Sequence, residues 1–142
     1  MGLDGTLSTY VLQAAGPLFT NVRWSGGIAF NHSDDAFPWF GFDRYALDLC
    51  LYWTVPMPWG GRSWIVTPGF RVAEWIYRAP DPTIDPFIAE RAFEWQAGVA
   101  LDIPIGNQVG LGLQVLYRAI SSNIAIYTIN DLAITMGPTV RF

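Results

Sequence analysis

Large apolar residues return at every second position through much of the chain. In residues 44–56 the large apolar residues occupy the odd-numbered positions, from Tyr45 to Val55, and the even-numbered positions hold mostly small or polar residues. Successive side chains of a β-strand point to opposite faces, so this period of two predicts a strand. Pro68 fits such a run only at a sheet edge or a bulge, because proline cannot donate to a ladder. The same alternation predicts five more strands, in residues 21–31, 63–77, 91–104, 107–120 and 124–142.

The first twenty residues carry two competing patterns. A strand from Thr6 to Phe19 could end at the Gly16-Pro17 turn, but the apolar residues there have helical spacing. Residues 1–20 are therefore an N-terminal strand or a short helix, followed by strands in residues 21–142. Residues 79–90, or a split of 121–142, are other sources of strands. We predict about eight strands in one domain over residues 1–142. Without these additions, copies of the chain would have to share one wall.

The second parity indicates what covers the sheet. It holds mostly Gly, Ala, Ser, Thr and Gln, with one or two charges per strand, whereas a water-facing surface carries many charged residues. Charged residues make up 14% of the chain and hydrophobic residues 51%. No stretch of about 18 uncharged apolar residues exists, which excludes a transmembrane helix. We predict an all-β, antiparallel, up-and-down transmembrane β-barrel with small residues in its lumen. A soluble lipocalin-like barrel is the alternative.

The connections alternate between short and long. Residues 57–61 and 104–107 are tight turns with Pro and Gly, whereas residues 32–42 and 79–90 are long and acidic. Short periplasmic turns and long extracellular loops are typical of transmembrane barrels. Trp53, Trp59, Trp64 and Phe142 would lie at the periplasmic rim, and a second aromatic group, including Trp39 and Tyr77, at the outer rim. Aromatic rings favour both bilayer interfaces, so the pattern predicts aromatic girdles.

The last eight residues, TMGPTVRF, combine a polar residue, a glycine and two alternating hydrophobic positions, the second aromatic. This tail resembles the C-terminal assembly signal of bacterial outer-membrane β-barrel proteins. Thr135, Gly137, Val140 and Phe142 occupy the positions of that signal. The resemblance covers the architecture of about residues 21–142 and points to no particular family. It implies a location in the outer membrane of a Gram-negative bacterium and the barrel-assembly machinery as a partner.

The charged residues at the alternate positions that hold small side chains are few enough to form ion pairs with one another. Counting from the tight turns places Asp48 opposite Arg71, and places Glu94 similarly opposite Arg118 about the 104–107 turn. Charges in a low-dielectric interior need partners. A salt-bridged interior that fills a narrow barrel is favoured over a gated lumen, because a small barrel has little space for a channel. The expected lumen charge network comprises Asp48, Arg71, Glu94, Arg118, Asp102, Arg141 and Arg23, with Asp102 and Arg141 near the periplasmic end.

Candidate chemistry is weak. His32 and Ser33 could act as base and nucleophile of a lipid hydrolase, but neighbours in a strand point to opposite faces unless the chain turns there. Asp34, Asp35, Asp81 and Asp85 offer oxygen ligands for Ca²⁺, although their spacing matches no calcium motif. We therefore expect no metal and no cofactor. The net charge of −4 and the lack of a basic patch exclude nucleic acid as a partner class.

These patterns favour a non-catalytic, porin-like small outer-membrane barrel. Its role would be structural or adhesive, or it would bind a partner through the acidic loops, in contact with outer-membrane lipids and lipopolysaccharide. The first alternative is a lipid-modifying hydrolase that uses His32 and Ser33. The second is a narrow passive pore, formed by one chain or by a homo-oligomer. The only cysteine, Cys50, faces the lumen in this interpretation and rules out an intramolecular disulfide.

Overall fold

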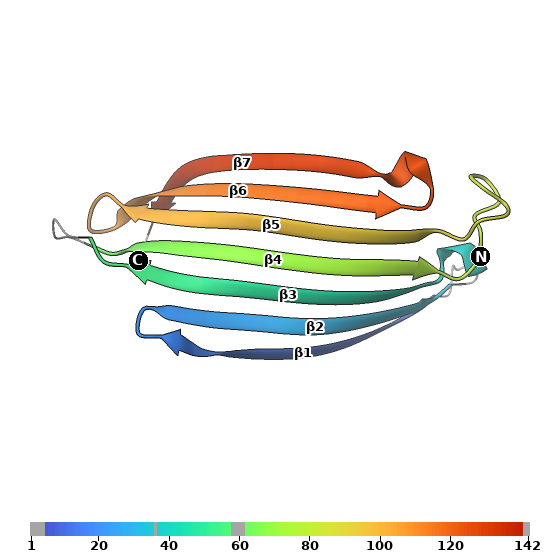
Figure 1. Cartoon of the computed structure of the whole chain (residues 1–142), viewed down its shortest axis with the longest axis horizontal. Coiled ribbons are helices and arrows are strands. Elements are labelled where there is room, and N and C mark those ends of the chain that lie inside the picture. Colours follow the sequence, from blue (N-terminus) through green and yellow to red (C-terminus); the bar gives the residue numbers. More distant parts are fainter. Residues whose placement is uncertain (1–4, 36, 58–61, 141–142) are drawn as a thin grey trace.

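Seven strands form one antiparallel sheet in which every strand pairs with its neighbours in the sequence (Figure 1). The computed structural model describes residues 5–35, 37–57 and 62–140, so expectations for Trp59, Arg141 and Phe142 fall outside the described residues. Within these ranges the sheet is all-β, with two short 3₁₀ turns, η1 and η2. The elements are β1 (Thr6–Phe19), β2 (Val22–Asp34), η1 (Pro38–Phe40), β3 (Phe42–Val55), β4 (Trp64–Tyr77), β5 (Arg91–Pro104), β6 (Val109–Ser122), η2 (Ala125–Tyr127) and β7 (Ile129–Val140).

The described N-terminal segment is a strand, β1, so the helical interpretation was wrong for Thr6–Phe19. β1 pairs along its length with β2, from Thr6 opposite Asp34 to Phe19 opposite Val22. It runs through the Gly16-Pro17 pair and shifts register between Pro17 and Phe19. A helix of this length is marginal by itself, and pairing with β2 satisfies the backbone groups instead.

The prediction of about eight strands was also wrong, since the described residues form seven. Residues 79–90 add no strand because Pro80, Pro82 and Pro86 each remove a backbone donor. The 121–142 segment is divided between the end of β6, η2 and β7. Among the described residues no pairing joins β1 to β7, and the sheet is open.

Other boundaries differ by a few residues. β2 extends to Asp34, which shortens the expected 32–42 loop, and η1 occupies part of what remains. β7 begins at Ile129 rather than at residue 124. Pro68 lies inside β4, a central strand, and not at an edge. The ladder between β3 and β4 stops at Cys50 opposite Gly69 and resumes at Trp53 opposite Val66 without a register shift, so the proline interrupts it locally.

The two faces of the sheet differ in side-chain size. We call the face that carries Ala46, Asp48 and Cys50 of β3 the small-residue face, and the face that carries Tyr45, Leu47 and Leu49 the large-apolar face. The latter three side chains are 51%, 48% and 47% exposed. Their small and polar neighbours on β3 are less exposed, which inverts the arrangement of a soluble sheet.

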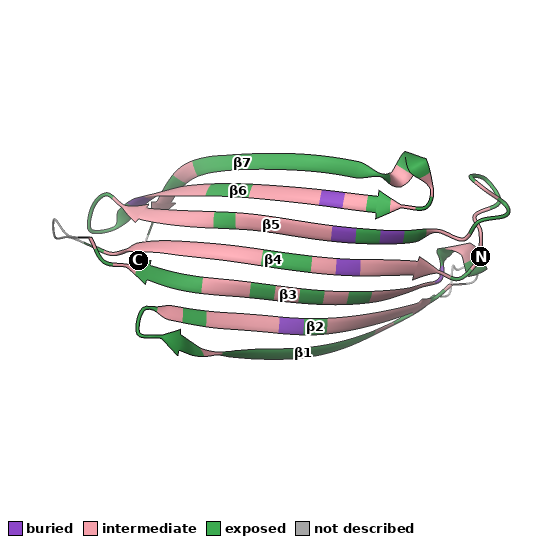
Figure 2. Cartoon of the chain, viewed as in Figure 1, coloured by how far each residue is buried: buried purple, intermediate pink, exposed green. Residues whose placement is uncertain are grey.

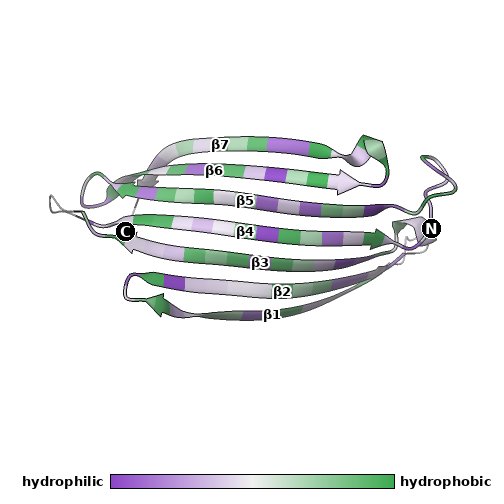
Figure 3. Ribbon diagram, viewed as in Figure 1, coloured by the Kyte–Doolittle hydropathy of each residue, from purple (hydrophilic) through white to green (hydrophobic). Residues whose placement is uncertain are grey.

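The described residues contain no buried large apolar side chain. The buried hydrophobic residues are Ala73, Ala92 and Ala119, and the buried charged residue is Glu94. Figure 2 shows only scattered buried positions on the strands, and Figure 3 shows hydrophobic and hydrophilic residues alternating along them. The sheet therefore has no core on either side that would cover its apolar face.

Long and short connections lie at opposite ends of the strands. At the turn end, β1 meets β2 across residues 20–21, and β5 meets β6 across residues 105–108. The described residues 35, 37–41, 78–90 and 123–128 lie at the loop end. Trp53 and Trp64 lie toward the turn end, and Trp39 and Tyr77 at the loop end. In the part of the chain that is described, no helix is long and apolar enough to cross a membrane.

Candidate functional site

One residue from each strand forms a transverse row on the small-residue face. Direct register partners connect the row from β1 to β7, and adjacent cross-strand partners share a face. Asp48 lies opposite Arg71, which is the pairing that counting from the turn predicts. The members of this polar row are Gln13, Gly27, Asp48, Arg71, Gln96, Arg118 and Asp131.

Arg118 has partners in the row that the sequence argument missed. Gln96, not Glu94, lies opposite it on β5, and Asp131 lies opposite it on β7. An oxygen of Asp131 is 3.5 Å from a guanidinium nitrogen of Arg118. Asp131 shares the parity of Ala133 and Thr135, so extending the alternation of the last strand would have identified it.

Three other expected lumen charges, Glu94, Asp102 and Arg23, lie on the small-residue face outside the row. Glu94 lies opposite Ile120 and accepts a hydrogen bond from Nε2 of Gln96 at 3.2 Å. Asp102 accepts one from the Thr139 hydroxyl at 3.3 Å. Arg23, near the turn end, lies opposite Pro17 and is exposed. Of the tail positions, Thr135, Gly137 and Val140 lie on β7.

His32 belongs to a charged cluster on the large-apolar face at the loop end. Its Nδ1 is 2.7 Å from Oδ1 of Asp43, its partner across β3, and its Nε2 is 3.2 Å from Oδ2 of Asp34. One guanidinium nitrogen of Arg78 lies 2.7 and 2.8 Å from the two ring nitrogens, and the other contacts Asp34. The hydrogen bond that Arg78 donates to Asp34, together with the negative charge of Asp34, raises the pKa of the Arg78 guanidinium.

The structure does not bring Ser33 to His32. β2 continues without a turn as far as Asp34, so the two adjacent side chains point to opposite faces. The serine directly opposite His32 on the same face is Ser8, its register partner on β1. Ser8, His32 and Asp43 thus form one transverse line across β1, β2 and β3.

The acidic loop residues are used locally. Asp81 accepts hydrogen bonds from the backbone and the hydroxyl of Thr83 at 2.8 and 2.7 Å, which lower its pKa. Asp35 and Asp85 each accept a hydrogen bond from the backbone N–H of the residue two positions later, at 3.3 and 2.9 Å, as is common for aspartates in turns. Over the described ranges, no group of three or more His, Cys, Asp or Glu side chains could hold a metal ion.

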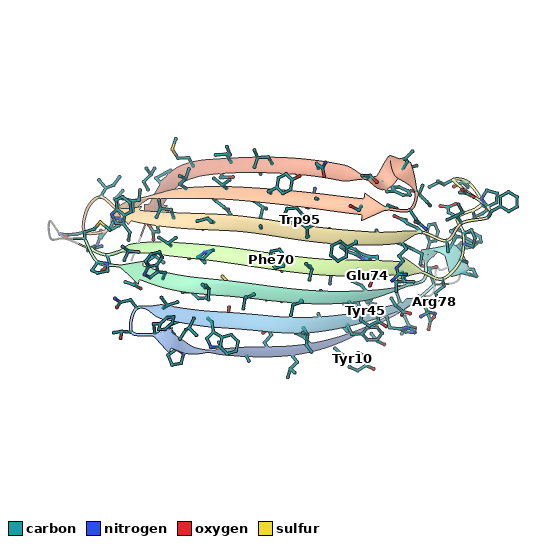
Figure 4. The ribbon with its side chains drawn as sticks, viewed as in Figure 1. Tyr10, Tyr45, Phe70, Glu74, Arg78 and Trp95 are labelled. Atoms are coloured by element: carbon teal, nitrogen blue, oxygen red, sulfur yellow. The ribbon has the colours of Figure 1, made fainter. Side chains whose placement is uncertain are left out.

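Two hollows lie near the loop end. A shallow groove of about 580 Å³ crosses β1 to β5, lined by Tyr10, Phe30, Tyr45 and Phe93 among others. Phe30 connects it to the charged cluster, with its ring 6.4 Å from that of His32. Figure 4 labels Tyr10, Tyr45 and Glu74 around the groove, and Arg78 at the loop end. A second cavity of about 280 Å³ lies among the three long connections. Sequence reasoning predicted neither hollow.

No family model, no curated protein and no solved structure matches this chain. The chemistry of the two faces and of the loop end therefore carries the functional argument.

Proposed function

We propose that this chain is the wall of a bacterial outer-membrane β-barrel, with its large-apolar face toward lipid and its small-residue face toward a narrow interior. One observation carries the proposal. The described chain has seven long strands and no buried large apolar side chain, while many of its large apolar side chains are exposed. A soluble domain gains about 1.5–3 kcal/mol from each large apolar side chain that it buries. Here the bilayer would supply that apolar environment.

The strand dimensions support this location. Each strand has 12 to 14 residues, and a tilted strand needs about 9–11 to cross the hydrocarbon layer. Backbone groups inside a bilayer must be paired, and a sheet with ladders on both sides of each inner strand pairs them. The role proposed for the protein is non-catalytic: structural, adhesive or partner-binding through the loop end, in contact with outer-membrane lipids and lipopolysaccharide.

Adjacent cysteine probes test which face meets lipid. Native Cys50 reports on the small-residue face, and Leu49→Cys in a Cys50→Ser background reports on the large-apolar face one residue away. Both proteins are labelled with a polarity-sensitive fluorophore after refolding into lipid vesicles. We expect blue-shifted emission, quenched by lipid-borne quenchers, from residue 49 alone. Equal emission from both positions would overturn the orientation.

Heat modifiability tests the closed wall. Refolded protein is run on an SDS gel with and without boiling. A compact unboiled band near monomer size is expected for a wall that the protein closes by itself. An unboiled band of several-fold larger apparent mass would mean that several copies of the chain share one wall. That outcome would favour the pore function. Absence of any shift would contradict the bilayer location.

A second candidate is an ester hydrolase on the large-apolar face, with Ser8 rather than Ser33 as nucleophile. The observation that favours it is the Ser8–His32–Asp43 line, with 2.7 Å between the histidine and the aspartate. Such an order of nucleophile, base and orienting carboxylate is that of serine hydrolases. Release of fatty acid from phospholipid vesicles, abolished in both His32→Ala and Ser8→Ala and kept in Ser33→Ala, would establish it. No release by the wild type would exclude it.

A further inference from the structure

The cavity among the three long connections is rich in aromatic rings. We call it the loop cavity. Trp39 and Phe40 come from η1, Tyr77 from the end of β4, and Tyr127 from η2. Two carboxylates, Asp81 and Glu90, complete the polar part of the lining. At about 280 Å³ the cavity is of a size for a small headgroup rather than for a peptide or a whole lipid.

Backbone contacts hold these connections together. The N–H of Arg78 donates to the carbonyl of Gly41 at 3.1 Å, which joins the first two connections. The N–H of Tyr77 donates to the carbonyl of Glu90 at 3.0 Å. Asn123 ties in the third connection, because its side-chain amide donates to the carbonyl of Ala89 at 2.9 Å and accepts from the N–H of Arg91 at 2.8 Å. The lining is therefore pre-organised before a ligand enters.

The charge of the cavity is one-sided. The two arginines that flank the connection carrying Asp81 and Glu90 are engaged elsewhere. Arg78 contacts Asp34, Asp43 and His32. A guanidinium nitrogen of Arg91 lies 2.6 Å from a carboxylate oxygen of Glu74. Among the described ion pairs, none involves Asp81 or Glu90. Burial raises the pKa of the Glu90 carboxyl, and a hydrogen bond with Ser122 opposes this shift only in part. A bound cation would stabilise the ionised form of Glu90.

We propose that the loop cavity binds a quaternary or methylated ammonium group, with the aromatic rings around the cation and Asp81 and Glu90 as its counter-charge. Aromatic faces attract cations within about 6 Å of the ring, and rings grouped around a cavity suit an ammonium that has no N–H to donate. An unmethylated ammonium would need several acceptors, and Asp81 is already engaged with Thr83. This inference deepens the proposed binding role and rests on it, since it requires the loop end to face the aqueous side.

Choline is the probe, and its neutral carbon isostere, 3,3-dimethylbutanol, is the matched control ligand. Both are titrated by calorimetry into refolded protein in a maltoside detergent, which carries no ammonium group. We expect saturable binding of choline and at least tenfold weaker binding of the isostere, because shape and apolar area are shared and only the charge differs. Equal affinities, or no saturable binding of choline, would overturn the proposal. This comparison needs no variant.

Variants locate the site. Trp39→Leu and Glu90→Gln should each weaken choline binding at least tenfold. Phe87→Ala is the matched control, because Phe87 lies in the same connection as Glu90, is 89% exposed and does not line the cavity. Unchanged binding in the first two variants would place the ligand elsewhere and contradict the proposal. If Trp39→Leu fails to refold, Tyr127→Leu takes its place.

The pH dependence adds an independent readout. Glu90 has a raised pKa and Asp81 a lowered one, and the phenols of Tyr77 and Tyr127 line the same cavity. As the pH falls, Glu90 takes up a proton before Asp81, because the pKa of Glu90 is raised and that of Asp81 is lowered. Choline affinity should fall with it, and Glu90→Gln should remove this dependence. The boiled and unboiled gel of the same samples separates the two proposals: a heat shift without choline binding overturns only the ligand, and binding without a heat shift overturns only the barrel.

Discussion

The two faces of this sheet have the same strands and the same backbone, yet they differ in almost every chemical respect. On β6, Gln114 faces the small-residue side and Val115, the next residue, the large-apolar side. The first face carries the polar row and most of the strand glycines, and the charges of the second face lie at its loop end. The second carries leucines, tyrosines and tryptophans that nothing in the described chain covers. In a soluble sheet the polar face would be the exposed one. This difference in exposure is the observation on which the proposed membrane environment rests.

The largest effect should come from a charge placed on the wrong face. Val115→Arg should destabilise the protein in lipid vesicles by about 2–4 kcal/mol, because an arginine near the bilayer midplane is costly in a membrane strand. Gln114→Arg is the matched variant, one residue away on the small-residue face, and should cost much less. The free energy of unfolding is measured by urea titration in vesicles. Similar losses for the two variants would remove the distinction between the faces.

An intermediate effect should come from close packing on the small-residue face. Gly69 and Gly98 lie directly opposite each other. A Cβ on Gly98 would lie 2.9 Å from the carbonyl oxygen of Val115, whereas the nearest atom to a Cβ on Gly69 is 3.8 Å away. Gly98→Ala should therefore destabilise by about 1–3 kcal/mol through overpacking, and Gly69→Ala should be near neutral. Urea titrations of both variants check this, and a neutral Gly98→Ala would show that the ladder can shift.

The smallest effect should come from the polar row. Arg118 and Asp131 are 42% and 53% exposed, and such ion pairs contribute about 0–1 kcal/mol. A double-mutant cycle with Arg118→Gln and Asp131→Asn should give a coupling within that range. A much larger coupling would mean that the small-residue face is closed off from water. If the row lines a pore, Arg118→Ala should also change discrete conductance steps in planar bilayers; a filled interior gives none.

Alternation was sufficient to predict β2 to β7, because a period of two depends only on residue type. It also gave the pairing of Asp48 with Arg71. It did not place Glu94, because the β5–β6 turn sets the register through the N–H groups of Ile105 and Gly106, which both donate to the carbonyl of Val109. A turn displaced by two residues moves a cross-strand partner along the strand, and sequence counting cannot detect that displacement.

The first strand and the loop end required the structure for different reasons. In β1, helical spacing and strand pairing compete, and only the partner β2 decides between them. At the loop end, Trp39, Glu90 and Tyr127 are far apart in the sequence and become neighbours through the hydrogen bonds of Gly41, Asn123 and Tyr77. The resemblance of the tail to an assembly signal remains a prediction, since Phe142 lies outside the described residues.

The number of strands has a directional consequence. In an antiparallel sheet each strand reverses the direction of the one before, so β1 and β7, with five strands between them, run the same way. A wall closed by joining these edges directly would contain one parallel seam. Two copies related by rotation about the axis of the wall would meet at two parallel seams. A wall antiparallel at every seam requires one further strand, or another odd number, running opposite to both edges.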